Sequence, residues 1–246
     1  MKRLIQAVLR PFGLRLARID AAGQPAFGLD VLFAALKRHG FRPAHVIDVG
    51  ANHGNWTRKA IEYFPDASYT LVEPQDALER EVQDLIDRGC KIRWIRTGAG
   101  DTMGTRPFSI NSRDDSSFFP GNGYPPADGA RLVSVEVRTL NDIVATSGLP
   151  VPSMVKIDAE GFDLKVLAGA TELLGKTEVF LVEAAVCETQ YENSVLAVTQ
   201  TMAKAGYRLI DITELNRSPR DNALWLCELV FLRTQSPLLD AVTSYD

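Results

Sequence analysis

The sequence is short of the residues that build metal and disulfide frameworks. Its 246 residues include only three cysteines and three histidines, and neither type shows metal-ligand spacing. This pattern excludes a disulfide framework and a zinc site of paired cysteines, and it is typical of structural thiols in a reducing compartment. No apolar run approaches the roughly 20 residues that a membrane-spanning helix needs. Positive charge is not in excess, since the formal net charge is −4, so we expect no nucleic-acid partner.

What is present suffices for one sizeable α/β domain, because 46% of the residues are hydrophobic. In residues 1–19 every charge is positive and apolar side chains separate the charges. The apolar core is too short for a signal peptide, and no small-residue cleavage site follows. Such a segment packs across the domain as a helix or lid, which we favour, or contacts an anionic membrane surface or a partner. We assign residues 1–27 to this basic amphipathic segment and its linker, and 28–246 to a cytoplasmic domain, with peripheral membrane contact left open.

The rest of the chain is organised around residues 45–55, HVIDVGANHGN. A short apolar run leads into a turn of the form G-x-N-x-G, and a helical pattern of apolar residues follows. Gly50 and Gly54 permit positive φ, as Asn52 does more rarely, and small residues let backbone N–H groups approach a ligand. Strand, glycine-rich turn and helix in this order open a nucleotide-binding α/β fold.

Two acids at strand ends indicate which ligand the turn serves. Asp48 stands at the turn, where a carboxylate would repel the pyrophosphate of a dinucleotide. The ammonium and sulfonium groups of S-adenosylmethionine are both positive and suit an acid there. Glu73 ends the next predicted strand, where an acid accepts hydrogen bonds from ribose hydroxyls. Helix capping is the structural alternative for these acids.

Helices and strands alternate after this unit. A helix is predicted over 77–86 and a third strand over 92–95, which implies a parallel sheet with right-handed crossovers. Ligands of such sheets bind outside the carboxyl ends of the strands. The stretch 98–101 lies at such an end, and it either walls an adenine or forms a plain turn.

A second acidic motif follows at residues 154–161, MVKIDAEG, and a later strand ends in Glu183. Asp158, Glu160 and Glu183 are therefore expected at the same rim of the sheet as the two earlier acids. Acids gathered there raise one another's pKa, as a general base requires. The same oxygens suit a divalent cation, so a metal-dependent reaction stays open, and helix N-capping is the structural alternative.

Two further regions interrupt or end the alternation. Between predicted strands at 106–110 and 132–137 lies a long loop, at about 111–126, rich in hydroxyl and aromatic side chains. It either contacts a polyhydroxylated substrate or forms a solvated hairpin tip. Strands predicted at 207–211 and 225–231 flank a polar break and indicate an antiparallel hairpin at the sheet edge.

The first motif, VIDVGANHG at residues 46–54, resembles the cofactor loop of the FkbM family of S-adenosylmethionine-dependent methyltransferases. Residues 155–170, VKIDAEGFDLKVLAGA, are similar to that family's second and more specific signature, and the likeness spans roughly residues 45–185. The resemblance implies an α/β fold: a seven-stranded, mostly parallel Rossmann-like sheet with helices on both faces and a reversed C-terminal strand. It also implies O-methylation of a hydroxyl on a sugar, glycolipid or polyketide-type small molecule, with S-adenosyl-L-methionine as the cofactor.

The likeness and the strand ends together give the expected site residues. Those expected to bind the cofactor are Asp48, Gly50, Ala51, Asn52, Gly54, Asn55, Glu73, Pro74, Ala99, Asp101 and Asp158. Asp158 falls on the rim that faces the methyl group. Glu160 follows from chemistry alone, and either rim acid is a candidate to accept the proton of the acceptor hydroxyl.

Two other functions stay open. An NAD-dependent oxidoreductase would need a third glycine where Asn55 stands, and Asp48 counts against it. A non-catalytic nucleoside-binding or membrane-docked partner protein would bind ligand or lipid without turnover.

Overall fold

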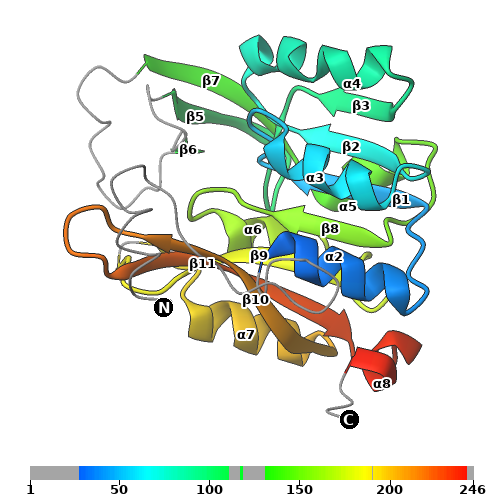
Figure 1. The fold of residues 1–246 in the computed structure, drawn as a ribbon. Helices are drawn as coiled ribbons and strands as arrows, with labels where there is room; N and C mark the ends of the chain where they lie inside the picture. Colours follow the sequence, from blue (N-terminus) through cyan, green and yellow to red (C-terminus); the bar gives the residue numbers. More distant parts are fainter. Residues whose placement is uncertain (1–27, 111–116, 119–130, 190, 243–246) are drawn as a thin grey trace, which may run out of the picture.

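The computed structural model describes residues 28–110, 117–118, 131–189 and 191–242 (Figure 1). The basic segment and linker at 1–27 lie outside the described residues, as does the predicted 111–126 loop apart from 117–118. In the described part of the chain, no helix combines the length and the apolar character that crossing a membrane requires.

The main sheet has seven strands in the order β10-β11-β9-β8-β1-β2-β3. Five neighbouring strands are parallel: β1 (His45–Val49), β2 (Ser68–Val72), β3 (Lys91–Ile95), β8 (Met154–Ile157) and β9 (Val179–Ala185). The antiparallel hairpin at one edge consists of β10 (Tyr207–Arg217) and β11 (Leu224–Arg233), with β11 beside β9. The predicted seven-stranded, mostly parallel sheet with a reversed C-terminal strand is confirmed.

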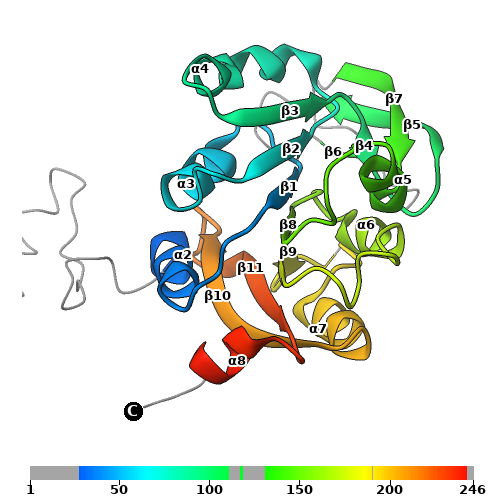
Figure 2. The same ribbon diagram turned by 90° about the vertical axis from the view of Figure 1, so that its right-hand side faces the viewer.

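Helices cover both faces of this sheet (Figure 2). One face packs against α2 (Leu29–Arg38), α3 (Asn55–Tyr63), α4 (Gln83–Asp87) and α8 (Pro237–Val242). The other face packs against α5 (Leu140–Ala145), α6 (Asp163–Ala168) and α7 (Val195–Lys204). All five residues of β1 are buried, as expected of a parallel strand with helices on both sides. Each face of the sheet thus forms an apolar core with its helices, and the removal of this apolar surface from water stabilises the fold.

A second sheet has four strands in the order β4-β7-β5-β6. They are β4 (Gly98–Ala99), β5 (Gly104–Ile110), β6 (Ser117–Phe118) and β7 (Arg131–Arg138). The strands β5 and β7 agree with the two predicted there. The stretch 98–101, for which the sequence leaves a turn and an adenine wall open, contains β4, and Gly98 pairs with Val137. This stretch therefore carries the chain from the main sheet into the second one.

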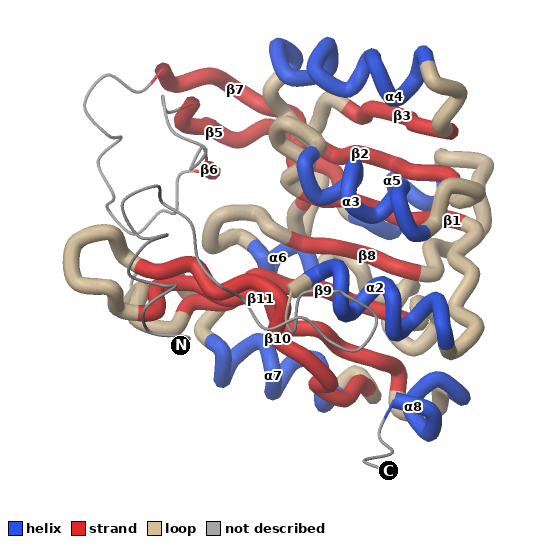
Figure 3. Tube along the Cα trace, viewed as in Figure 1, coloured by secondary structure: helices blue, strands red, loops and turns tan. Residues whose placement is uncertain are grey.

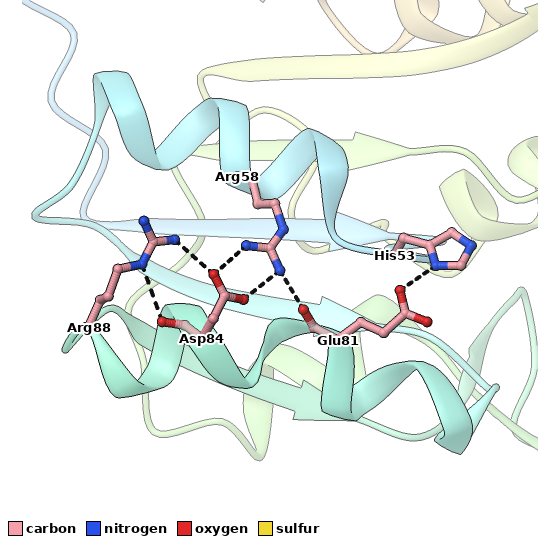
Figure 4. Close-up of polar contacts among 5 residues, drawn as sticks. All are labelled: His53, Arg58, Glu81, Asp84 and Arg88. Atoms are coloured by element: carbon pink, nitrogen blue, oxygen red, sulfur yellow. Dashed lines mark hydrogen bonds and ion pairs between the residues drawn. The ribbon is translucent and has the colours of Figure 1, made fainter.

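The region predicted as a single helix over 77–86 differs from the structure. It forms a 3-10 helix, η2 (Asp76–Val82), followed by the short α4. Ion pairs hold this segment against the glycine-rich turn and α3 (Figure 4). Arg58 contacts Asp84 at 2.6 Å, and His53 Nδ1 lies 2.5 Å from Glu81 Oε2. These tertiary contacts fix a segment whose sequence alone favours a regular helix.

The edge hairpin is also longer than predicted (Figure 3). The strand expected to end at Asp211 continues to Arg217. Register shifts within β10 interrupt its pairing with β11, so the period-two pattern of a strand does not extend to its end. Leu226 pairs with Ala185 at the carboxyl end of β9. The turn of the hairpin therefore lies at the edge of the sheet where the parallel strands end.

Candidate active site

A pocket of about 320 Å³ lies at the carboxyl ends of β1, β8 and β9. The glycine-rich turn and the start of α3 contribute Gly50, Ala51, Asn52, His53, Asn55 and Trp56. The strand β8 and the loop after it contribute Lys156, Asp158 and Glu160, and β9 contributes Glu183. The hairpin contributes Glu214, Asn216, Leu226, Cys227 and Glu228. This is the crevice in which ligands of open parallel sheets bind.

The glycine-rich turn needs the residue types that it contains. Gly50 and Gly54 have φ of 69° and 73°, and Asn52 has φ of 45°. A Cβ atom on Gly50 would lie 1.8 Å from the backbone oxygen of Asp158. A Cβ atom on Gly54 would lie 2.6 Å from Cγ1 of Val82. The turn is therefore packed between the end of β8 and η2, with no room for a side chain at either glycine.

Glu73 fixes this turn from the end of β2. Its Oε2 accepts a hydrogen bond from the backbone N–H of Asn52 at 3.1 Å, and its Oε1 accepts one from that of Gln75 at 3.0 Å. Burial raises the pKa of Glu73, and these hydrogen bonds oppose the shift. Glu73, Pro74 and Gly54 are not among the residues that line the pocket. Glu73 thus lies directly behind the turn that does line it.

Asp48 lies beneath the pocket and is fully buried. It accepts a hydrogen bond from the Thr57 hydroxyl at 2.6 Å, and its Oδ1 lies 3.4 Å from Lys156 Nζ. The same ammonium lies 3.1 Å from Asp158 Oδ2 and donates to the backbone oxygen of Gly50 at 3.2 Å. Burial lowers the pKa of Lys156, but the carboxylates of Asp158 and Asp48 outweigh it and the pKa is raised. Lys156 therefore stays charged and joins the turn to both acids.

The loop after β8 holds Glu160 in a left-handed conformation, with φ of 49°. This conformation is uncommon for a residue with a side chain and often marks functional sites. Glu160 Oε2 accepts a hydrogen bond from the Tyr191 hydroxyl at 3.1 Å. Asp163 steadies the loop, because its carboxylate accepts from the backbone N–H groups of Ala159 and Gly161 at 3.0 and 3.1 Å. Burial raises the pKa of Asp163 to about 7.

The hairpin supplies pocket residues that sequence analysis did not identify. Glu228 is buried and accepts a hydrogen bond from the Thr213 hydroxyl at 2.5 Å, and burial raises its pKa to about 8. Glu214 and Asn216 reach the pocket from β10, and the buried thiol of Cys227 reaches it from β11. The sequence predicts the hairpin but not which of its side chains face the pocket, because register shifts between β10 and β11 decide that.

Ala99 and Asp101, two further residues expected to contact the cofactor, also lie apart from the pocket lining. Ala99 is buried in β4. Asp101 pairs with Arg106 at 3.3 Å and with Lys165 at 3.7 Å, which ties the second sheet to α6. Across the described ranges, no group of three or more His, Cys, Asp or Glu side chains is arranged to hold a metal ion. The metal-dependent alternative gains no support from these side chains.

Residues 48–209 match a known protein family, described as the methyltransferase FkbM domain. The match includes the glycine-rich turn, the acids that follow β8, and Glu183, which lies within β9 and not at its end as the sequence predicts. The chain belongs to the FkbM methyltransferase family. The family resemblance seen in the two sequence motifs is confirmed.

Individual relatives are distant. 2-O-methyltransferase NoeI of Sinorhizobium fredii (strain NBRC 101917 / NGR234) is 24% identical over 150 residues, which cover 56% of this chain and 62% of NoeI. Methyltransferase sdnD of Sordaria araneosa is 27% identical over 157 residues, 52% of this chain and 60% of sdnD. The crystal structure of methyltransferase FkbM from Methylobacillus flagellatus KT has a TM-score of 0.49 at 18% identity, covering 76% of this chain and 43% of that one. The chain spans about six-tenths of the length of the curated relatives it matches.

Proposed function

We propose that the protein is an S-adenosylmethionine-dependent O-methyltransferase acting on a hydroxyl of a sugar, glycolipid or polyketide-type small molecule. The observation that carries the proposal is the pocket, because it joins the glycine-rich turn to a rim of carboxylates. Membership of the FkbM family supports methyl transfer. The name of NoeI, a 2-O-methyltransferase, supports oxygen as the acceptor atom.

The charges around the pocket fit a cationic methyl donor. Five carboxyl side chains line it, and the one lysine in the lining, Lys156, is already paired with Asp48 and Asp158. A ligand with an ammonium and a sulfonium group gains from such surroundings, whereas the pyrophosphate of NAD would be repelled. The lining therefore favours S-adenosylmethionine over a dinucleotide.

The residues of the turn are assigned to donor binding. When bound, S-adenosylmethionine supplies an electrophilic methyl group on a positively charged sulfur. The turn residues that line the pocket, 50–53 and 55, would contact the donor. Glu73 holds the turn by its hydrogen bond to Asn52, and Asp48 holds it through Lys156. Because the turn is fixed before binding, it orients the donor without losing conformational entropy of its own. Such positioning contributes much of the catalysis when the leaving group is already good.

A carboxylate at the rim would take the proton of the acceptor hydroxyl, because an alcohol is a weak nucleophile until that proton is removed. Asp158 and Glu160 are the two acids that the sequence selects, and both line the pocket. If Asp158→Asn and Glu160→Gln both keep near-normal turnover in folded protein, neither acid is the base.

Calorimetric titration with S-adenosylmethionine, its demethylated product and NAD tests the proposal. We expect the first two to bind and NAD not to bind. Glu73→Gln should weaken donor binding by about tenfold or more, because it removes a charge-assisted hydrogen bond that shapes the turn. The exposed Glu172→Gln, a matched change away from the pocket, should leave binding unchanged.

The alternatives give different results in the same assay. Binding of NAD alone would contradict the proposal and support an oxidoreductase. Binding of S-adenosylmethionine without methyl transfer to any member of a panel of hydroxylated acceptors would support a non-catalytic nucleoside-binding protein. Restored activity on adding magnesium after chelation would support the metal-dependent variant.

A further inference from the structure

The three rim carboxyl groups differ in what already binds them. Asp158 is paired with the Lys156 ammonium at 3.1 Å, and Glu160 accepts from the Tyr191 hydroxyl at 3.1 Å. Glu183 Oε2 is shielded from solvent, yet it has no hydrogen-bond partner among the residues that the structure describes. Because Glu183 lines the pocket, its carboxyl is a buried polar group available to a ligand there.

The surroundings of Glu183 are acidic. The titratable groups that face it are Asp158, Glu160, Asp163, Lys156 and Tyr191. Burial, and then the neighbouring carboxyl groups, raise the pKa of Glu183 well above its ordinary value, and the Lys156 ammonium opposes them. A free carboxyl in such a place holds its proton more tightly than an exposed one.

We propose that Glu183 accepts the proton of the acceptor hydroxyl, an inference that rests on the proposed function. The acceptor oxygen forms a bond to the methyl carbon while the carbon–sulfur bond breaks and its electron pair stays on sulfur. The hydroxyl proton goes to the Glu183 carboxylate. The products are a methyl ether and a neutral thioether, and the proton passes from Glu183 to solvent when they leave.

Glu183 suits this role better than its two neighbours. Asp158 and Glu160 each already have a partner, the Lys156 ammonium and the Tyr191 hydroxyl, which an acceptor hydroxyl would have to displace. Burial raises the pKa of Glu183, and a carboxylate with a raised pKa takes up a proton more readily. Glu183 must be ionised to act, and a cation in the pocket favours that form. Binding of the positively charged donor should therefore release a proton from Glu183.

Proton release can be counted without an acceptor. S-adenosylmethionine is titrated into the protein by calorimetry in buffers of different ionisation enthalpy, from mildly acidic to mildly alkaline pH. We expect wild type to release up to about one proton more per bound donor than Glu183→Gln. The neutral thioether product should give a smaller difference than the donor. At the acidic end of this range the donor affinity of the two proteins should agree within about threefold, and wild type should bind the donor progressively more tightly than Glu183→Gln as the pH rises.

Glu228 is the competing source of a proton, because it lines the same pocket and burial raises its pKa to about 8. Proton release by Glu228→Gln is therefore measured in the same way. This variant should still release the protons that Glu183→Gln fails to release when the donor binds. Thermal unfolding of both variants checks that they fold, and glutamine preserves the shape of each side chain.

The outcomes separate this inference from the proposed function. Equal proton release by wild type and Glu183→Gln overturns the role of Glu183, as does a loss confined to Glu228→Gln. Failure of wild type to bind S-adenosylmethionine overturns the proposed function itself. Once a hydroxyl acceptor is in hand, Glu183→Gln should lower kcat by about 100-fold or more.

Discussion

The two walls of the pocket are built in different ways. One wall is the glycine-rich turn at residues 50–55, held by Glu73 from behind and by Lys156 from below. The other wall is the β10–β11 hairpin, which joins the parallel strands through the pairing of β11 with β9. Short sequence motifs and the ion pairs of Lys156 fix the first wall. The pairing of β10 with β11, which contains register shifts, fixes the second. The wall that we assign to the methyl donor is therefore the more constrained of the two.

The largest expected effect comes from removing the ammonium that holds the turn wall. Lys156→Met would leave Asp48 and Asp158 without their shared counter-charge, one of them fully buried. Breaking a buried ion pair from one side costs about 3–5 kcal/mol in the free energy of unfolding, which urea denaturation measures. Lys204→Met, at an exposed position of α7, should change stability by less than about 0.5 kcal/mol. Similar small losses in both variants would show that the ion pairs do not hold this wall.

A smaller effect on stability, with a specific effect on the ligand, is expected at Gly50. Gly50→Ala places a Cβ where φ is 69° and 1.8 Å from the Asp158 backbone oxygen. The conformation alone costs about 1–2 kcal/mol, and the overlap displaces the turn, so calorimetry should show loss of S-adenosylmethionine binding. Gly148→Ala is the matched control, with φ of 71° and no atom within 4 Å of the new Cβ. It should lose about 1 kcal/mol of stability and bind the donor normally. Normal binding by both variants would contradict the role of the turn.

The smallest expected effect is that of a substitution in the hairpin wall, at Glu214. Glu214 lines the pocket but is exposed. Glu214→Gln should change the affinity for S-adenosylmethionine by less than about twofold and stability by less than about 0.5 kcal/mol. Calorimetry and urea denaturation measure the two. A tenfold loss of donor affinity would mean that the hairpin wall also holds the donor, and the division between the walls would fail.

The sequence predicts the turn wall better than the hairpin wall, for a physical reason. Gly50 and Gly54 occupy positions where the positive φ of the backbone favours glycine. The spacing of glycines in the sequence therefore predicts the turn directly. Which hairpin residues face the pocket depends on where β10 shifts its register against β11, and a period-two pattern does not record such shifts. Glu214 and Asn216 were missed for this reason.

Asp48 illustrates a second limit of sequence reasoning. An acid at the end of a strand points either into the ligand crevice or into the core, and the strand pattern allows both. The side chain of Lys156, on the neighbouring strand β8, makes the buried position favourable by pairing with it. The decisive partner is more than 100 residues away in sequence, since the two positions are numbered 48 and 156.

The hairpin wall also carries a chemical reporter. Cys227 lines the pocket and is only 4% exposed, and burial raises the pKa of its thiol, whereas Cys187 is exposed. A thiol-alkylating reagent should therefore modify Cys187 first and Cys227 slowly, since the thiolate is the reactive form. A compound seated in the pocket would slow only the second reaction. Mass spectrometry of the alkylated chain would thus record occupancy by unlabelled compounds, including those that are never methylated.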